Sequence, residues 1–412
     1  MKKLTNTEKA AIVYTKNTNP TNPETVTHDT PLEELNLNWS EKELPERIRT
    51  KHVHRLHPYL GKYIPQLVEI FLRKFFKPGQ TVLDPFCGSG TTLIQANELG
   101  INSVGYDISA FNIILENAKT LKYNIKKVKS EIYDVLDKIE AITQSNKPNR
   151  QLRIDDLKQF APDIPKIDSK YLNNWFAPQA LLELITFREL IFTGDYEYKD
   201  LLKIILCRSA RSARLTTHFD LDFPKKPQME PYHCYKHSRI CHPTQEAYKF
   251  IKRYSVDTVR RVEEFSTIRT DASIKIEHTD SRCAEIPPIN GVITSPPYVG
   301  LIDYHEQHVY AYKLLGLEER KEHEIGPASN GSSQKAIQEY KKSIAEVFSR
   351  IASSMVNGGR MIVVANDKAN IYPEIAEMAG VETESVVQRH VNRRTGRRSG
   401  EFFESIFIWK KP

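Results

Sequence analysis

The sequence lacks any apolar run of the roughly 20 residues that a membrane-spanning helix needs. Residues 1–8 contain no apolar core of the kind that defines a signal peptide. Internal repeats and low-complexity tracts are also absent. These absences argue against membrane-spanning and secreted proteins, and we expect a cytoplasmic chain without a membrane partner.

Cysteine is scarce, with five residues at positions 87, 207, 234, 241 and 283. An odd number without an export signal indicates reduced thiols. Residues 232–242 gather five potential zinc ligands, but their spacing is neither that of a CxxC site nor that of a common finger. We interpret this segment as a basic aromatic loop that contacts phosphate or packs on the core, and we expect no metal. The five residues are His233, Cys234, His237, Cys241 and His242.

The rest of the composition is ordinary for a globular protein, with 40% hydrophobic and 27% charged residues. A chain of 412 residues can hold one large core and a second, smaller one. Residues 1–44 are rich in Thr, Asn, Pro and Lys and lack periodicity, which predicts a mobile arm with one helical turn near 32–37.

Periodicity predicts the remaining elements. Apolar residues at helical spacing predict helices at 66–76, 125–145 and 304–314, and a mostly helical segment over 125–270. Short apolar or alternating runs predict strands, the last two of which form a terminal hairpin. The predicted strands cover 82–83, 103–107, 273–277, 291–294, 361–364, 385–390 and 402–409.

A glycine-containing loop follows the first of these strands. Residues 81–92 read TVLDPFCGSGTT, so Asp84 stands at the carboxyl end of a short buried strand, where open α/β sheets bind ligands. The glycines allow a tight turn and close approach of a ligand to the backbone. Asp107 ends the next strand, where a second acidic residue would meet ribose hydroxyls. NAD is the weaker ligand, because Leu93 replaces the third glycine of the dinucleotide fingerprint.

A second motif, TSPPY at 294–298, ends the predicted strand at 291–294. Two consecutive prolines carry no N–H and hold the preceding residues extended. The Ser295 hydroxyl and the carbonyl of Pro296 can therefore face a cleft and accept both hydrogens of an exocyclic amino group on a nucleobase. Tyr298 can stack on the ring of that base. A plain Pro-Pro turn at a strand end is the structural alternative.

With both motifs in one chain, the sequence resembles the S-adenosylmethionine-dependent DNA amino-methyltransferases of the cytosine-N4 type. The segments HPYLGKYIP at 57–65, HTDSR at 278–282 and LIDY at 301–304 resemble neighbouring motifs of that family. The resemblance covers roughly 45–123 and 274–412, a little over half of the chain. The cofactor motif precedes the catalytic motif, an order that places the target-recognition region between them.

The resemblance implies an α/β, Rossmann-like methyltransferase fold with a mostly parallel sheet and a terminal antiparallel hairpin. We expect residues 45–124 and 271–412 to form the catalytic domain, and 125–270 to form an inserted, largely helical target-recognition region. The catalytic motif would be Ser295, Pro296, Pro297 and Tyr298. The cofactor S-adenosylmethionine would contact Tyr59, Lys62, Asp84, Phe86, Cys87, Gly88, Ser89, Gly90, Thr91, Thr92, Asp107, Ile108 and Asp280.

A net charge of +7 favours a polyanionic partner, and the basic residues fall in three runs. Any one run alone is typical of a solvated face. Together with the methyltransferase motifs they predict a cleft for double-stranded DNA. The residues expected at DNA are Arg208, Arg211, Arg214, Lys236, Arg239, Arg393, Arg394, Arg397 and Arg398.

The hypothesis is direct methyl transfer to the N4 amino group of a flipped cytosine. Cytosine-C5 chemistry needs a cysteine nucleophile, typically after proline, and the sequence has no Pro-Cys pair. We expect a prokaryotic, nucleoid-associated enzyme, the modification half of a restriction–modification pair whose cognate endonuclease acts separately. The alternatives are an adenine-N6 DNA methyltransferase, an RNA methyltransferase and a non-catalytic, zinc-stabilised nucleic-acid-binding protein.

Overall fold

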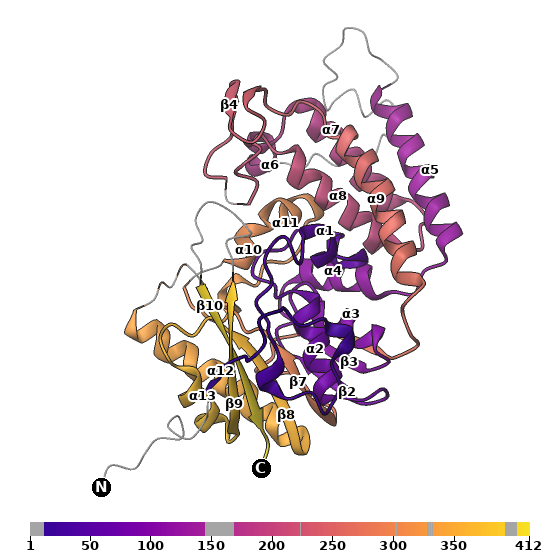
Figure 1. Ribbon diagram of the computed structural model, residues 1–412. Helices are drawn as coiled ribbons and strands as arrows, with labels where there is room; N and C mark the ends of the chain where they lie inside the picture. Colours follow the sequence, from indigo (N-terminus) through magenta and orange to yellow (C-terminus); the bar gives the residue numbers. More distant parts are fainter. Residues whose placement is uncertain are drawn as a thin grey trace.

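The computed structural model describes residues 12–144, 169–222, 224–300, 303–327, 329, 331, 333–391 and 402–412. An eight-stranded sheet, drawn in the lower half of Figure 1, forms its centre in the order β1-β9-β10-β8-β7-β2-β3-β6. The strands are β1 (Ile12–Val13), β2 (Thr81–Asp84), β3 (Asn102–Asp107), β6 (Ile274–His278), β7 (Ile289–Thr294), β8 (Met355–Ala365), β9 (Glu382–Val391) and β10 (Phe402–Lys410).

All neighbouring strands of this sheet run parallel, except that β10 is antiparallel to both β8 and β9. The prediction of an α/β fold with a mostly parallel sheet and a terminal antiparallel hairpin is therefore confirmed. The order of the parallel strands reverses between β2 and β7. Ligands of open α/β sheets bind outside the carboxyl ends of the strands at such a reversal.

Helices cover both faces of the sheet, because successive side chains of its strands point alternately into two apolar cores. On β8, Met361 and Val363 face one core, and Ile362 faces the other. The first core contains α12 (Gln334–Ser354) and α13 (Tyr372–Ala379), and the second contains α2 (Pro65–Phe75) and part of α3 (Thr91–Glu98). Figure 1 shows these two layers on either side of the strands.

The N-terminal segment differs from the prediction of a mobile arm over 1–44. From residue 12 onward it packs against the second core, where Leu35, Leu37 and Trp39 are buried. Strand β1 pairs in parallel with β9. The expected single helical turn is present as the short 3₁₀ helix Leu32–Glu34. This segment is ordered without any periodic pattern because its scattered apolar side chains are buried in the core beside the sheet.

The described residues between 125 and 270 form a second, mainly helical body above the sheet in Figure 1. Its core also takes in α4 (Ala110–Thr120) and α11 (Val309–Leu315), which join it to the sheet layers. A two-stranded hairpin, β4 (Tyr232–Cys234) and β5 (Arg239–Cys241), belongs to no larger sheet. The helices are α5 (Ile125–Gln144), α6 (Lys170–Trp175), α7 (Pro178–Thr193), α8 (Lys199–Ala213) and α9 (Tyr248–Ser266).

The remaining elements are single turns. They are α1 (Glu46–Arg49), α10 (Tyr304–Gln307) and the 3₁₀ helices Pro23–Thr25, His52–Arg55 and Lys321–His323. Within the described ranges, no helix has both the length and the apolar character required to cross a bilayer. The predicted DNA-contacting residues Arg393, Arg394, Arg397 and Arg398 lie outside the described residues.

Candidate active site

A cavity lies at the carboxyl ends of β2, β3 and β7, where the strand order reverses. It brings together the two motifs, which are about 200 residues apart in sequence, because Ser295 and Pro297 line it together with the glycine loop. Ten of the predicted cofactor residues line the cavity: Tyr59, Lys62, Phe86, Cys87, Gly88, Ser89, Thr91, Asp107, Ile108 and Asp280.

Asp84 does not line the cavity, although it was predicted to contact the cofactor. Its Oδ1 accepts hydrogen bonds from Thr294 Oγ1 (2.6 Å) and the Phe86 amide (3.1 Å). Its Oδ2 accepts from Thr92 Oγ1 (2.7 Å) and the Tyr63 hydroxyl (3.0 Å). Burial raises the pKa of this carboxyl, while the hydrogen bonds oppose that rise. The side chain therefore ties the ends of β2 and β7 together beneath the loop. Gly90 and Thr92 do not line the cavity either.

Two glycines let the chain pass closely around the cavity. Gly88 has φ +56°, and a Cβ there would lie 3.2 Å from the Tyr59 hydroxyl. A Cβ at Gly105 on β3 would lie 2.8 Å from Cys87 Sγ. A side chain at Gly88 would be strained by the backbone and would meet the cavity wall. The sequence analysis did not single out Gly105. Its lack of a side chain matters because Cys87 packs against it in the structure.

Asp107 ends β3 and lies in the cavity wall. Its Oδ2 accepts from the Gly88 amide (2.7 Å) and Asn112 Nδ2 (3.0 Å), and its Oδ1 accepts from the Ser109 amide (2.8 Å). Burial raises its pKa to about 6, against the effect of these hydrogen bonds. The Oδ1 atom keeps acceptor capacity, which a ribose hydroxyl can use.

Asp280 stands across the cavity from the glycine loop and is held by Arg282. The Arg282 Nη2 donates to Asp280 Oδ2 (2.6 Å) and its Nε donates to Oδ1 (3.0 Å). Burial alone would raise the pKa of Asp280, but the contacts with Arg282 bring it below the ordinary value. The carboxylate is thus ionised and oriented at the cavity wall.

Tyr59 and Lys62 also line the cavity, and Tyr59 lies beside Gly88 of the glycine loop. The Tyr59 hydroxyl accepts from Asn112 Nδ2 (3.1 Å), and Lys62 Nζ donates to the His54 carbonyl (2.9 Å). Burial lowers the pKa of Lys62 to about 8. The segment HPYLGKYIP at 57–65, which resembles a family motif, therefore does lie on the cavity.

The catalytic motif joins this cavity to a second, larger cleft. Ser295 and Pro297 line the cavity, and Tyr298 lines the cleft. The Pro297 carbonyl accepts from the Tyr340 hydroxyl (2.8 Å), while Pro296 is buried. The Ser295 hydroxyl is shielded from solvent and makes no hydrogen bond of ordinary length and angle in the described ranges of the chain, although it lies close enough to the Tyr298 hydroxyl to lower the pKa of that group. Ser295 lines only the cavity, three residues before Tyr298 of the cleft, and its hydroxyl can both donate and accept a hydrogen bond.

Tyr298 is held by a residue that the sequence did not single out. Its hydroxyl donates to Glu404 Oε1 on β10 (3.2 Å), and Arg389 on β9 lies 3.6 Å from Glu404 Oε2. Burial and then the charge of Glu404 hold the pKa of Tyr298 well above its usual value, and nearby Ser295 opposes that rise. Nothing in an alternating strand distinguishes Glu404 from a solvent-facing glutamate, so this contact had no sequence signal.

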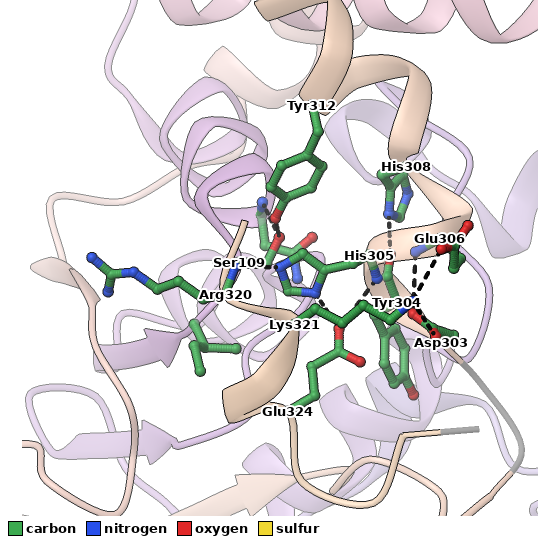
Figure 2. A network of polar contacts seen from close by, with 12 residues as sticks. Ser109, Asp303, Tyr304, His305, Glu306, His308, Tyr312, Arg320, Lys321 and Glu324 are labelled. Atoms are coloured by element: carbon green, nitrogen blue, oxygen red, sulfur yellow. Dashed lines mark hydrogen bonds and ion pairs between the residues drawn. The ribbon is translucent and has the colours of Figure 1, made fainter. Parts of the chain in front are cut away.

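The segment after the catalytic motif covers one side of the cavity. Figure 2 shows His305 pointing at Glu324, with which its Nδ1 forms a short polar contact. Lys321 bridges Asp303 (3.1 Å) and Glu306 (3.0 Å). Glu324 itself lines the cavity, and its Oε2 is buried without a hydrogen-bonding partner among the described residues. These contacts fix residues 303–324 as a wall, which the sequence suggested only through the LIDY resemblance.

The larger cleft lies between the sheet with its covering helices and the second, mainly helical body. Tyr298 lines it, and its acidic lining residues are Glu46, Asp222, Asp257 and Glu404. Nine basic residues line it: Arg49, Arg55, Lys62, Arg208, Arg211, Lys236, Arg253, Arg260 and Arg389. The cleft is thus strongly basic and opens beside the catalytic motif.

The structure separates the predicted basic residues. Arg208 and Arg211 line the cleft and pair with Asp257 (2.8 Å) and Asp222 respectively. Arg214 does not line it: the side chain is buried over the ring of Tyr310 and donates to the Leu221 carbonyl (2.6 Å). Arg214 is therefore a structural side chain in this state. Lys236 lines the cleft, whereas Arg239 lies on the outer side of β5 in a separate hollow.

Comparison with known proteins agrees with this geometry. A family model described as DNA methylase matches residues 2–116, and one described as an RMKL-like methyltransferase domain matches residues 73–165. Type II methyltransferase M.MjaII of Methanocaldococcus jannaschii is 38% identical over 433 residues, covering 89% of this chain and 82% of that protein. The chain belongs to the type II DNA methyltransferases.

A second type II methyltransferase, M.BsoBI of Geobacillus stearothermophilus, is 24% identical and covers 72% of this chain and 60% of that protein. Among solved structures, TrmN from Thermus thermophilus has a TM-score of 0.34 and 10% identity, covering 86% of this chain and 50% of that chain. That likeness is too distant to bear on function.

S-adenosylmethionine is the cofactor of this methyltransferase, and the cavity residues fit it. A nucleoside needs an acceptor for its ribose hydroxyls, which the buried Asp107 carboxylate offers. The loop at Gly88 has no Cβ that would fill the space beside Tyr59. Asp280 lines the same cavity and offers a further acceptor to the cofactor.

Proposed function

We propose that this type II DNA methyltransferase modifies the exocyclic N4 amino group of cytosine in duplex DNA. The observation that carries the proposal is the Ser295 hydroxyl, which is buried between cavity and cleft without a hydrogen-bonding partner in the described part of the chain. A buried, unpaired hydroxyl costs free energy, and Ser295, unlike the equally unpaired Ser103, lines the cavity, where a bound group can complete its hydrogen bonding.

Bound S-adenosylmethionine supplies an electrophilic methyl group. On the protein side, the Ser295 hydroxyl and the Pro296 carbonyl accept the two amino hydrogens of the base, as the Pro-Pro geometry favours. The amino lone pair would thereby be directed at the methyl carbon: the bond from that carbon to the sulfonium sulfur would break as the carbon–nitrogen bond forms, S-adenosylhomocysteine would leave, and the nitrogen would release its surplus proton to solvent. Positioning and fixed dipoles supply most of the rate in such a reaction.

Tyr298 is the platform on which the flipped base stacks. Its hydroxyl is anchored by Glu404, so that the ring is held at the boundary between the cleft and the cavity. Tyr340 holds the adjacent Pro297 carbonyl in the same way. A target base must leave the helix to reach this point, because a stacked and paired base cannot enter the cavity.

The basic cleft is the proposed DNA-binding surface. It opens beside Tyr298, and Arg208, Arg211 and Lys236 line it. Phosphate contacts from such residues position the duplex without reading sequence. The described helices between residues 125 and 270 contribute Arg208, Arg211 and Arg253 to the cleft and belong to the proposed target-recognition region.

Two finer assignments rest on the resemblance of the TSPPY motif. Serine before Pro-Pro-Tyr is associated with cytosine N4, and aspartate or asparagine with adenine N6, so adenine is the second candidate base. Modification by a type II enzyme further implies a separate cognate endonuclease as the partner system.

The test is nucleoside mass spectrometry of DNA from cells that express the protein, with the Ser295→Ala variant as control. N4-methylcytosine that requires the intact protein supports the proposal. N6-methyladenine would retain the enzyme class and overturn the base. Unmodified DNA with the wild-type protein present and folded would contradict the DNA substrate.

A further inference from the structure

The hairpin β4–β5 has little apolar packing of its own. It forms a separate two-stranded sheet, and Tyr235 and Ile240 are 67% and 57% exposed. An isolated two-stranded hairpin is marginally stable in water unless something else fixes it. Yet both cysteines of the hairpin are buried: Cys234 is fully buried, and Cys241 is 6% exposed.

Four side chains converge at the base of this hairpin. They are His218, which follows α8, together with Cys234, His237 and Cys241. Cys234 ends β4, Cys241 ends β5, and His237 lies in the turn between them. Their potential ligand atoms all lie within 4.8 Å of one another.

The spacing of these atoms matches the edges of a metal tetrahedron. Cys234 Sγ lies 3.7 Å from His218 Nδ1 and 3.5 Å from His237 Nδ1, and Cys241 Sγ lies 3.5 Å from His237 Nδ1. Zinc bonds of about 2.3 Å to sulfur and about 2.0 Å to nitrogen at tetrahedral angles give a sulfur–nitrogen edge of about 3.6 Å.

We propose that His218, Cys234, His237 and Cys241 bind one zinc ion that fastens the β4–β5 hairpin to the end of α8. Two thiolates and two imidazoles complete the shell of a structural zinc site and leave no open position for water or substrate. The arrangement departs from the expectation of a metal-free loop. The two adjacent histidines, His233 and His242, stay outside the cluster.

Local backbone geometry suits this role. Ser238 has φ +50°, and the His237 amide donates to the Cys234 carbonyl (3.1 Å), so the turn folds His237 back over the strand end. The Tyr232 hydroxyl lies 2.9 Å from His218 Nδ1 and also accepts from the His218 amide (3.0 Å). On metal binding this hydroxyl would keep the amide bond and turn its hydrogen away from the ring.

The site has a consequence for DNA recognition, which rests on the function proposed above. Lys236, in the turn of the hairpin, and His218 both line the basic cleft. A zinc ion at the hairpin base would therefore hold one wall of that cleft. Loss of the ion would weaken DNA binding, whereas the cofactor cavity shares no residue with the four ligands.

The experiment measures zinc in the purified, untagged full-length chain by mass spectrometry, after dialysis against metal-free buffer with a reductant. The proposal predicts about one zinc per chain, lost in His218→Ala and Cys234→Ser and retained in the matched controls His233→Ala and His242→Ala. Replacement by Co²⁺ should give the visible spectrum of a tetrahedral thiolate site. That spectrum reports on ligation even if a variant is poorly folded.

Three results would overturn the proposal: no bound metal in the wild type, equal zinc loss in His233→Ala and His218→Ala, or thiol titration showing a Cys234–Cys241 disulfide. Zinc content is independent of methylation, so failure of the proposed base specificity leaves this test intact. In Cys234→Ser, we also expect DNA affinity to fall by about tenfold or more while S-adenosylmethionine affinity stays unchanged. Unchanged DNA affinity in a zinc-free variant would refute the cleft-wall role alone.

Discussion

Replacing Ser295 with alanine should separate stability from catalysis. The Ser295 hydroxyl is buried and makes no hydrogen bond of ordinary geometry within the described ranges, so its removal costs no more than its contact with the Tyr298 hydroxyl. A buried, unsatisfied polar group costs about 1–3 kcal/mol. After allowance for the small void left behind, we expect the variant to be as stable as the wild type, or more stable by up to about 1 kcal/mol.

Ser103 on β3 provides a matched control. Its hydroxyl is also buried without a partner in the described residues, but Ser103 does not line the cavity. Both alanine variants should therefore show the same small gain in denaturant unfolding. Only Ser295→Ala should lose methyl transfer, by about 10²–10³-fold in kcat, the usual effect of removing one preorganised hydrogen-bonding group.

The assay is transfer of labelled methyl groups to DNA under saturating cofactor, alongside chemical unfolding of all three proteins. The reasoning is refuted if Ser295→Ala keeps full activity. It is also refuted if Ser295→Ala is destabilised by several kcal/mol while Ser103→Ala is not, because the hydroxyl would then have a structural partner.

Three further predictions concern the cofactor, the base and the DNA. Burial raises the pKa of Asp107 to about 6, so its carboxyl is protonated below that pH. The affinity for S-adenosylmethionine, measured by calorimetry, should therefore fall below about pH 6. The Asp107→Asn variant should bind the cofactor weakly and without this pH dependence. Tyr298→Ala should lower kcat/KM by about 10- to 100-fold through lost stacking, whereas Tyr298→Phe should retain most activity because the ring remains. Lys236→Ala should reduce the salt slope of DNA binding by about one, in contrast to Lys252→Ala, which lies outside the described cleft lining.

The sign of the Asp107 effect on stability is opposite to that of an ordinary surface carboxyl. Because its pKa is raised on folding, ionisation destabilises the cofactor-free fold as pH rises from about 4 to about 6. Asp107→Asn should flatten that part of the stability profile. A pH profile identical to that of the wild type would contradict the burial argument.

Periodic segments were predictable from the sequence because their patterns reflect a single buried face. The amphipathic run at 125–145 is helix α5, Ile125–Gln144, and the terminal hairpin is β9–β10. The predicted helix over 304–314 is interrupted at His308, where α10 ends and α11 begins. A local pattern does not report such a break when both halves face the same core.

Other features depend on tertiary contacts that leave no local pattern. Leu35 and Trp39 are buried by the sheet, although their segment has no periodicity. Asp84 and Asp107 both stand at strand ends, and only the partners of Asp84 reveal that it faces inward rather than to the cavity. His218 joins the hairpin cysteines from a distant position in the sequence, which the spacing within 232–242 could not show.

The most direct test of the central claim is methyl transfer by the purified protein to unmodified DNA, with S-adenosylmethionine that carries a deuterated methyl group. The DNA is then digested, and its nucleosides are separated by mass. The account predicts that the label appears in N4-methylcytosine and is lost with Ser295→Ala. Label in N6-methyladenine or in C5-methylcytosine, or undiminished label with Ser295→Ala, would contradict it.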